Sequence, residues 1–503
     1  MTAIRRALIV TSAERYLNSA VNFLLIAAVS RLLTPEEIGV SVIGATIFGF
    51  AEVLRDIPSN YLVQKADLTR EDVRTTFTLL ALVSLMFAGA LTATSAWIAG
   101  IYEEAHLQLY LQVLAFAFLP GAFERPVTAL LRRDMAFPQV AVANVARVAV
   151  NGVVTVGLAL LGFSYMSFAW AALAGGLTAA ALAIRFGGRR WIFMPLFSNW
   201  RAAVRFGGSY SVAVLLATLY DLLPYVLLSR LHRLEDVGFY NRARMLSLLP
   251  HKLILSSFDP VALPALAAEA RAGRELKQPY LNAITHITVV QWPALLVLTI
   301  LAHPAIALLY GPQWIEIVPL AQIIAAAMLL SFTGGLNAPV LIAVGALRDL
   351  AMAFLICLPI SGAIVTASAF FGTTALALSM FVTVPLNGYV TQRVIRRHVP
   401  YAWSELGGAV WPSALVALCS AAGPLALIVV NGLRFDLSLG AAVIAAILAA
   451  AGWLAGLRLT RHPMLDELLQ VADGLRRSDR AEEAARAGTR ILRWHHASRP
   501  RSS

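Results

Sequence analysis

The chain has 503 residues, of which 59% are hydrophobic and 14% are charged, with a formal net charge of +12. A soluble domain carries about a quarter charged residues, so this composition excludes a single soluble domain and indicates a chain that faces mostly lipid or other membrane helices. The basic residues gather at the ends of apolar runs, as in membrane topology signals, and no nucleic-acid partner is predicted.

Apolar runs long enough to cross a bilayer follow one another along the chain, since a spanning helix needs about 20 mostly apolar residues. The first run carries Glu14 and Arg15 and is interpreted as a retained span rather than a cleaved signal. The sequence predicts an all-α integral membrane protein of about fourteen transmembrane helices, near 8–32, 38–62, 76–100, 107–130, 138–162, 164–186, 203–229, 237–263, 281–303, 315–344, 348–370, 373–394, 405–431 and 437–459.

The two sets of span ends differ in charge. One set carries only Arg31, Arg230, Arg233 and Arg434, whereas the other set carries most of the Lys and Arg residues of the loops. Basic loops stay in the cytoplasm, so we predict a multi-pass protein of a bacterial inner membrane with both termini in the cytoplasm. The stretch 461–503 is predicted to form an amphipathic, basic cytoplasmic tail.

One motif occurs twice: SRLLTPEEIGV at 30–40 returns as SRLHRLEDVGF at 229–239, a shift of 199 residues (229 − 30 = 199). Each copy joins the first two spans of a set of six, and six is even, so both sets enter the membrane from the same side. The sequence therefore predicts two parallel six-helix repeats with a central cavity between the halves, followed by two extra helices and the tail. The predicted units are 1–200, 201–400, 401–460 and 461–503.

No catalytic or metal-binding signature stands out in the sequence. There is no Walker lysine loop, no HExxH and no GxSxG motif. Cys357 and Cys419 lie in apolar runs without disulfide or metal-ligand spacing. The loops at the less basic ends are short, which speaks against an enzyme that handles sugar outside the membrane. Neither a cofactor nor an enzymatic activity is predicted.

Polar residues recur at helical spacing in the first half. Glu14, Asn18 and Asn22 share one face of the first span, flanked by Arg15. This face is either a wall of a hydrated cavity or a site of hydrogen bonding between helices, with Arg15 reaching the membrane interface. Arg147 in the fifth span has no nearby acid in sequence and is either a cavity cation or an interfacial one.

The eighth predicted span carries the strongest polar signal, with Arg242, Arg244, His251, Lys252 and Asp259. Arg244, His251 and Asp259 are seven and eight residues apart and share a helical face, and Lys252 lies beside it. Ionisable groups inside the membrane are costly and usually line water or a ligand site. This row therefore predicts an anion-binding wall of the cavity.

The repeat also pairs polar positions between the halves. Asp221 follows Asn22 by 199 residues (221 − 22 = 199), and Asp259 follows Asn60 by 199 residues (259 − 60 = 199). A parallel duplication would place such pairs at matching depths in one shared site.

Several segments resemble one known family: SRLLTPEEIGV, LRDIPSNYLVQKADLTREDVRTTF and LLRRDMAF in the first half, and LYGPQW at 309–314. They are similar to the Wzx-like oligosaccharide flippases of the polysaccharide transport family. That family belongs to the multidrug/oligosaccharidyl-lipid/polysaccharide exporter superfamily. The resemblance implies alternating-access movement of undecaprenyl-pyrophosphate-linked oligosaccharide for exopolysaccharide, capsule or O-antigen biosynthesis, alongside polymerase and co-polymerase proteins.

This activity gives the polar residues expected roles, because Arg and Lys bind pyrophosphate through charge-assisted hydrogen bonds. The expected substrate-binding residues are Arg244, Lys252, His251, Arg242, Arg15, Asn18, Asn22 and Arg147. The expected ion-coupling residues are Asp221, Asp259 and Glu14.

Two other functions remain open from the sequence. An ion-coupled multidrug or small-molecule antiporter of the same superfamily should favour an acid-lined cavity, whereas the eighth span is mainly basic. A membrane polysaccharide polymerase or ligase is disfavoured by the short loops.

Overall fold

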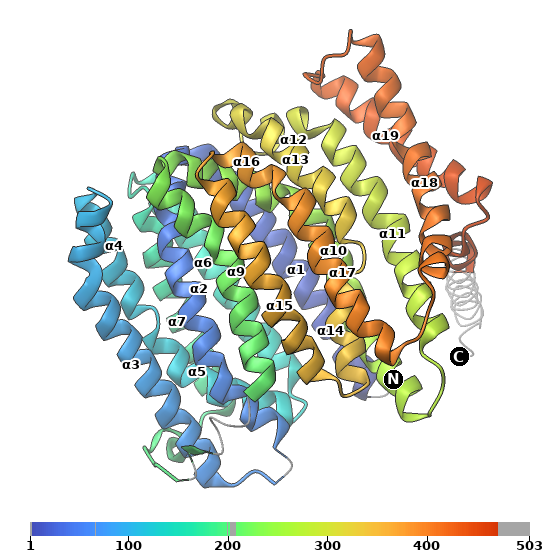
Figure 1. The fold of residues 1–503 in the computed structure, drawn as a ribbon. Coiled ribbons are helices and arrows are strands. Elements are labelled where there is room, and N and C mark those ends of the chain that lie inside the picture. The colour runs from blue at the N-terminus through green and yellow to red at the C-terminus, as the bar shows by residue number, and fades with distance from the viewer. Residues whose placement is uncertain (1–2, 66, 199, 202–207, 471–503) are drawn as a thin grey trace, which may run out of the picture.

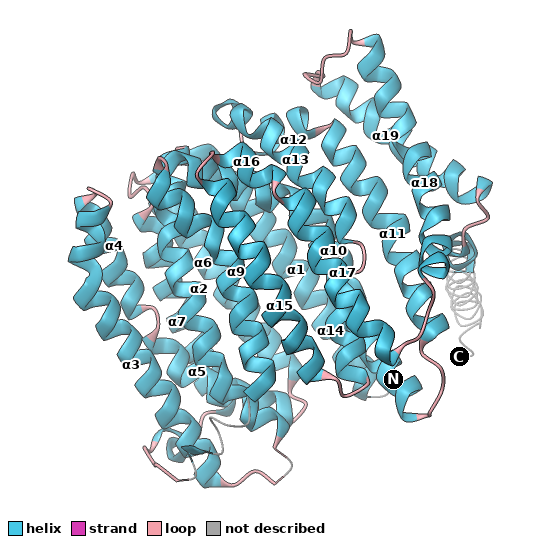
Figure 2. Ribbon diagram, in the orientation of Figure 1, coloured by secondary structure: helices cyan, strands magenta, loops and turns pink. Residues whose placement is uncertain are grey.

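Helices make up the structure, and no strand occurs among the residues described by the computed structural model, which are 3–65, 67–198, 200–201 and 208–470 (Figure 1 and Figure 2). The predicted all-α fold is confirmed. The helical elements are α1 (Ala3–Leu32), α2 (Pro35–Gln64), α3 (Arg70–Ile101), α4 (Ala105–Phe116), α5 (Leu119–Arg133), α6 (Phe137–Leu160), α7 (Met166–Gly187), η1 (Arg190–Phe193), α9 (Gly208–Leu231), α10 (Leu234–Arg271), α11 (Lys277–Ile300), α12 (Ala302–Leu309), η2 (Pro312–Ile317), α13 (Val318–Met328), η3 (Leu329–Ser331), α14 (Gly334–Ala343), α15 (Leu347–Ala369), α16 (Thr373–Leu378), α17 (Met380–His398), α18 (Trp403–Val430) and α19 (Leu439–Leu459).

Twelve stretches of the described residues are long and apolar enough to cross a membrane. Two long helices are not among them: α1 contributes a shorter apolar stretch, Leu17–Leu32, and α10 carries the basic row. With 30 and 38 residues, α1 and α10 are about 45 and 57 Å long at a rise of about 1.5 Å per residue. A multi-span membrane protein is confirmed, and the count of fourteen stays a prediction.

Three predicted spans are interrupted in the structure. The span expected at 107–130 consists of α4 and α5, which meet at residues 117–118, and Pro120 stands in the first turn of α5. Proline is favoured there because the first turn of a helix needs no N–H donor. The span expected at 315–344 divides into η2, α13, η3 and α14, and that at 373–394 into α16 and α17. Apolar length alone does not reveal such breaks.

The same helix pairs pack together in the first six and the second six spans. α1 packs on α6 as α9 packs on α15, and α2 packs on α5 as α10 packs on α14. α2 also packs against α9 and α10, which joins the two sets. This is the packing that a duplicated six-helix unit requires, while the boundaries of the predicted units stay a prediction. α18 packs on α11 and α19 on α18, at one side of the bundle (Figure 1).

The helix ends that carry most of the basic residues lie together at the lower end of Figure 1, where α2, α5, α7, α10 and α14 end. We call this end the basic face. α1, α3, α6 and α9 end at the opposite face. The helices of both halves therefore run between the basic face and the opposite face.

The segment after α19 folds back onto the bundle through His462, which is fully buried. Its Nδ1 accepts a hydrogen bond from the backbone N–H of Met464 at 3.2 Å, and its Nε2 lies 3.3 Å from the Ser413 hydroxyl in α18. Residues 463–470 are helical, and the predicted tail beyond them lies outside the described residues.

This packing predicts an acid-sensitive contact. Burial, and next the nearby His286, lower the pKa of His462 from its usual 6.5 to about 4. A lowered histidine pKa contributes stability that is present above about pH 6.5 and is lost as the pH falls toward about 4, at about 1.4 kcal/mol per unit. We therefore expect the rate of limited proteolysis after α19 to increase as the pH is lowered from 7.5 to 5.

The matched comparison uses two glutamine variants. His462→Gln should remove most of the pH dependence, because glutamine does not titrate, whereas His106→Gln, at an exposed histidine, should retain it. An unchanged pH dependence in His462→Gln would assign the effect to another group.

Candidate functional site between the two halves

The two copies of the repeated motif begin α2 and α10 in the same way. Glu37 accepts a hydrogen bond from the backbone N–H of Thr34 at 2.7 Å, and Asp236 accepts one from the backbone N–H of Arg233 at 3.2 Å. A carboxylate in the first turn satisfies a backbone donor and complements the positive helix end. The duplicated acids therefore fix where each helix begins.

The duplicated glycines, Gly39 in α2 and Gly238 in α10, lie where these two helices cross. A Cβ atom on Gly39 would lie 1.9 Å from the carbonyl oxygen of Leu234, and one on Gly238 would lie 2.0 Å from that of Pro35. The two backbones touch, which small residues permit between membrane helices. The halves are thus closed against each other at the face opposite the basic face.

The first Ser-Arg pair of the motif strengthens this closure. The Trp314 indole N–H donates to the carbonyl oxygen of Ser30 at 2.7 Å, and the Gln313 amide donates to the same oxygen at 2.7 Å. Arg31 donates to the carbonyl of Leu308, at the end of α12. The first half is therefore held by η2 and α12 of the second half.

The second Ser-Arg pair makes the reciprocal contact. The hydroxyl groups of Ser229 and Tyr102 are hydrogen-bonded at 2.9 Å, and the Arg230 guanidinium lies 5.5 Å from the centre of the Tyr102 ring. Tyr102 follows α3, in the first half. Each copy of the motif therefore binds the half to which it does not belong.

A cavity of about 360 Å³ lies beside this crossing, toward the middle of the helices, with walls from α2, α4, α7, α9 and α10. Both halves therefore line it, as the predicted central cavity requires. The polar side chains in its lining are Ser41, Thr46, Tyr110, Tyr225, Asn241 and Arg242.

Arg242 is the cation of this cavity, and its side chain is only 4% exposed. The guanidinium lies 5.9 Å from the centre of the Trp314 ring, and Nη1 lies 3.4 Å from the sulfur of Met245. Its Nε has no hydrogen-bond partner, and no ion pair forms with it among the described residues. A buried cation without a carboxylate is costly, which favours an anionic ligand.

Arg244, two residues further along α10, contacts α9. Its Nη2 lies 2.7 Å from Oδ1 of Asp221, and its Nη1 lies 3.3 Å from the Tyr225 hydroxyl. The Asp221 side chain is 58% exposed, so the pair borders an accessible space. Sequence position relates Asp221 to Asn22, whereas the structure gives it Arg244 as its partner.

The rest of the basic row follows along α10. Lys252 is exposed and lies within electrostatic range of Arg244 and Asp221, and His251 is half-buried. α10 packs against six helices of both halves, α1, α2, α9, α11, α13 and α14, so the basic row lies on a central helix of the bundle. The side chain of Asp259 lies outside the described residues.

Glu14, on the polar face of α1 shared with Asn18 and Asn22, contacts α6. Glu14 accepts a hydrogen bond from the Asn144 amide at 2.6 Å, and Arg147 donates to the same Asn144 at 3.5 Å. These contacts match the alternative of hydrogen bonding between helices. No contact among the described residues joins them to the basic row of α10.

Asn18 and Asn22, the other polar residues on this face of α1, do not take part in the Glu14–Asn144 contact. The Asn22 amide donates to the backbone oxygen of Asn18 at 2.8 Å, and Asn22 is exposed. Oδ1 of Asn18 is buried without a hydrogen-bond partner among the described residues. α1 packs against α10, so both asparagines stay candidates for the cavity wall. The side chain of Arg15 lies outside the described residues.

Sequence reasoning missed the tyrosines and the asparagine of the cavity. Tyr110, Tyr225 and Asn241 occur singly in apolar surroundings, where such residues are more often part of a packed core. The repeat adds no signal for the cavity, because the shift of 199 residues pairs Ser41 with Tyr240 and Asn241 with Val42.

A second charged group lies between α2 and α5. Glu52 binds the guanidinium groups of both Arg55 and Arg125, the latter at 2.7 Å. Arg55 also donates to the carbonyl oxygen of Phe118 at 2.8 Å and is 3% exposed. This group joins helices of the first half and does not line the cavity.

Two solved structures share this arrangement of helices. One is the lipid II flippase MurJ in an inward closed conformation, with a TM-score of 0.71, 10% identity, and coverage of 91% of this chain and 100% of MurJ. The other is an inward-facing multidrug resistance MATE family transporter, with a TM-score of 0.63, 14% identity, and coverage of 80% and 99%. The chain therefore has the multi-helix membrane fold of these two structures.

The chain belongs to the polysaccharide biosynthesis protein family whose model matches residues 28–319, which confirms the sequence resemblance. It is 22% identical over 310 residues to the lipopolysaccharide biosynthesis protein WzxC of Escherichia coli K12. It is 26% identical over 311 residues to the succinoglycan biosynthesis transport protein ExoT of Rhizobium meliloti. These alignments cover 61% and 60% of this chain and 63% and 62% of the relatives, so the chain spans less than two thirds of their length.

Proposed function

We propose that this protein is a flippase for undecaprenyl-pyrophosphate-linked oligosaccharide repeat units and not an enzyme. It moves them from the cytoplasmic to the periplasmic leaflet of a bacterial inner membrane for surface polysaccharide biosynthesis. The observation that carries this proposal is Arg242, buried in a cavity shared by both halves without a carboxylate partner among the described residues. Arginine suits the diphosphate because its planar donors match phosphate oxygens.

Arg244 and Lys252 extend this basic surface toward the basic face, and Tyr225 and Asn241 supply hydrogen-bonding groups for sugar hydroxyls. Phosphate and glycan groups lose hydrogen bonds to water as they enter the interface. Charge-assisted and neutral hydrogen bonds from these side chains would replace them. The family membership and the printed names of WzxC and ExoT support a polysaccharide precursor as the cargo.

An apolar groove of about 210 Å³ between α2, α3 and α9 suits the polyprenyl chain. It lies at the edge of the interface, so the chain can remain in lipid while the head group is inside. Its apolar lining comprises Ile43, Ile47, Trp97, Ile98, Ile101 and Val226.

The basic face is assigned to the cytoplasm by the positive-inside rule. With the duplicated glycines in contact at the proposed periplasmic side, this conformation is suited to a state that receives substrate from the cytoplasm. Alternation with an outward state would release it. Asp221, Asp259 and Glu14 are the proposed ion-coupling carboxylates, and polymerase and co-polymerase proteins are the proposed partners.

A multidrug antiporter is the second function that the fold allows. It fits less well, because the exposed carboxylate of Asp221 is paired with Arg244 and the other described cavity charge, Arg242, is positive. A cationic drug would meet repulsion at both arginines.

The test is complementation of a strain that lacks the gene. Arg244→Ala and Lys252→Ala should reduce surface polysaccharide about tenfold or more at normal protein level, because each removes a charged contact to diphosphate. Lipid-linked oligosaccharide should accumulate in the inner leaflet. Arg434→Ala, at an exposed loop pair with Asp436, should behave as wild type.

Normal polysaccharide in both the Arg244 and the Lys252 variant would overturn the assignment of the basic row to substrate binding. Loss of drug resistance with normal polysaccharide in the deletion strain would instead support the antiporter.

A further inference from the structure

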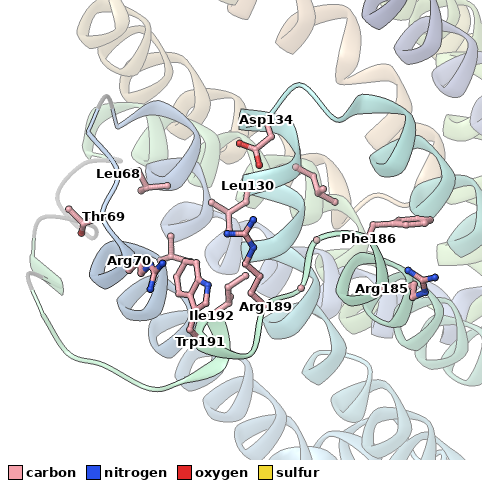
Figure 3. Close-up of a pocket in the computed structure, with 14 residues that line it drawn as sticks. Leu68, Thr69, Arg70, Leu130, Asp134, Arg185, Phe186, Arg189, Trp191 and Ile192 are labelled. Carbon is pink, nitrogen blue, oxygen red and sulfur yellow. The ribbon is translucent and has the colours of Figure 1, made fainter.

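A second pocket, of about 450 Å³, lies in the first half at the basic face, away from the interface between the halves (Figure 3). It is formed where α3 begins and where α5 and α7 end, and η1 closes one side. Apolar and aromatic side chains, among them Leu130, Phe186, Trp191 and Ile192, line part of it. An aromatic and apolar pocket at helix ends is placed at the level of lipid head groups.

Three arginines line this pocket, whereas Asp134 is its one acid. Arg189 lies beside Leu130 within the pocket, Arg70 lies beside Trp191, and Arg185 lies at the far edge (Figure 3). The Arg70 guanidinium is 5.4 Å from the centre of the Trp191 ring, which orients it. Among the described residues, none of these arginines forms an ion pair or donates a hydrogen bond to a side chain or carbonyl.

Neighbouring charges on the same face are already engaged. Arg74 donates to the carbonyl oxygens of Met194 and Pro195, at 3.0 and 3.2 Å. Asp72 is bound by Lys65 at 2.7 Å, and this hydrogen bond raises the pKa of Lys65. The pocket arginines therefore differ from their neighbours in having donors directed at open space.

Glu71, the other acid of the first turn of α3, accepts a hydrogen bond from the Ser198 hydroxyl at 3.0 Å. Neither Glu71 nor Asp72 lines the pocket, whose charged residues are three arginines and Asp134, so the pocket has a surplus of positive charge beside apolar side chains. This combination suits an anion attached to an apolar chain.

We propose that this pocket binds a phosphate group, carried by an anionic phospholipid of the adjacent leaflet or free in solution. Basic pockets between membrane helices bind phospholipid head groups in this way. Arg70 and Arg189 supply the charge-assisted donors, and the apolar side chains of the lining contact the first part of the acyl chains. The site is separate from the proposed transport path and does not depend on the transported substrate.

The test titrates the purified full-length protein with dioctanoyl phosphatidylglycerol, dioctanoyl phosphatidylcholine and inorganic phosphate. The double variant Arg70→Gln/Arg189→Gln should bind phosphatidylglycerol or phosphate at least about tenfold more weakly than the wild type. Arg132→Gln removes the same charge from an exposed arginine of the same face that does not line the pocket, and should bind as wild type. If the double variant misfolds, Arg189→Gln alone retains the Arg70–Trp191 contact and should still weaken binding.

The arms separate the two sources of phosphate. Phosphatidylglycerol binding that inorganic phosphate does not displace identifies a lipid head group, and binding of inorganic phosphate alone identifies a free anion. Either supports the site when the double variant loses it. The proposal fails if the wild type binds neither probe, or if Arg132→Gln weakens binding as much as the pocket variants.

Discussion

Replacing Gly39 or Gly238 by alanine is expected to abolish polysaccharide export while the protein still accumulates in the membrane. The added Cβ would lie 1.9 Å from the carbonyl oxygen of Leu234 in the first variant and 2.0 Å from that of Pro35 in the second. Both neighbours are backbone atoms, so no side chain can rotate away. The closed contact between α2 and α10 cannot form, and the equilibrium must shift toward states that are open at this face.

The measurement combines export with labelling of a cysteine introduced at Ser41, applied from the periplasmic side. Labelling should be faster in both alanine variants than in the parent. Gly49→Ala provides the control on the same helix, because a Cβ at Gly49 meets nothing within 4 Å. Normal export in both the Gly39 and Gly238 variants would show that closure at this crossing is not needed.

Among the substitutions considered for their effect on stability, Glu52→Gln is expected to lower the free energy of unfolding most. Its carboxylate binds Arg55 and Arg125 together, and Arg55 is almost fully buried. Breaking a buried ion pair by removing one partner costs about 3 to 5 kcal/mol, and since the Glu52 side chain is 21% exposed we expect about 3 kcal/mol. Thermal unfolding of the purified protein should show a clearly lower midpoint.

Glu36→Gln is the control for that experiment, since it removes an exposed carboxylate from the same helix. Its effect should stay at about 0.3 to 1 kcal/mol, the usual contribution of an exposed charge at a helix end. Equal midpoints for the two variants would mean that the Glu52 group does not stabilise the fold.

The apolar runs predicted the helical membrane fold because hydrophobic length is a local property of the chain. The pairing of Glu52 with Arg55 could also be predicted from the sequence, since residues three apart are neighbours on one helical turn. Arg125, however, reaches Glu52 from 73 residues away, and its neighbour Glu124 offered a simpler local partner. Which helices become neighbours is set by packing of the whole bundle, and one sequence does not state it.

The same limit applies to the candidate site. The basic row on α10 was visible from spacing, because mid-membrane charges are rare. Arg242 looked equivalent to Arg244, but residues two apart on a helix lie on different faces, and the two arginines have different surroundings. Arg242 stacks over Trp314, which belongs to η2, an interruption of the span that apolar length concealed.

The glycine crossing has a consequence for the origin of the chain. Gly39 contacts its repeat counterpart Gly238 and the carbonyl group of Leu234, four residues before Gly238. Gly238 in turn contacts Gly39 and the carbonyl group of Pro35, four residues before Gly39. The two sets of contacts are therefore related by a two-fold axis. That reciprocity defines an isologous interface, the kind formed by two identical subunits. Fusion of two copies would preserve the interface of an ancestral homodimer, with Gly39 and Gly238 as its centre. A substitution in one copy is then no longer mirrored in the other, which allows a basic row on one side only.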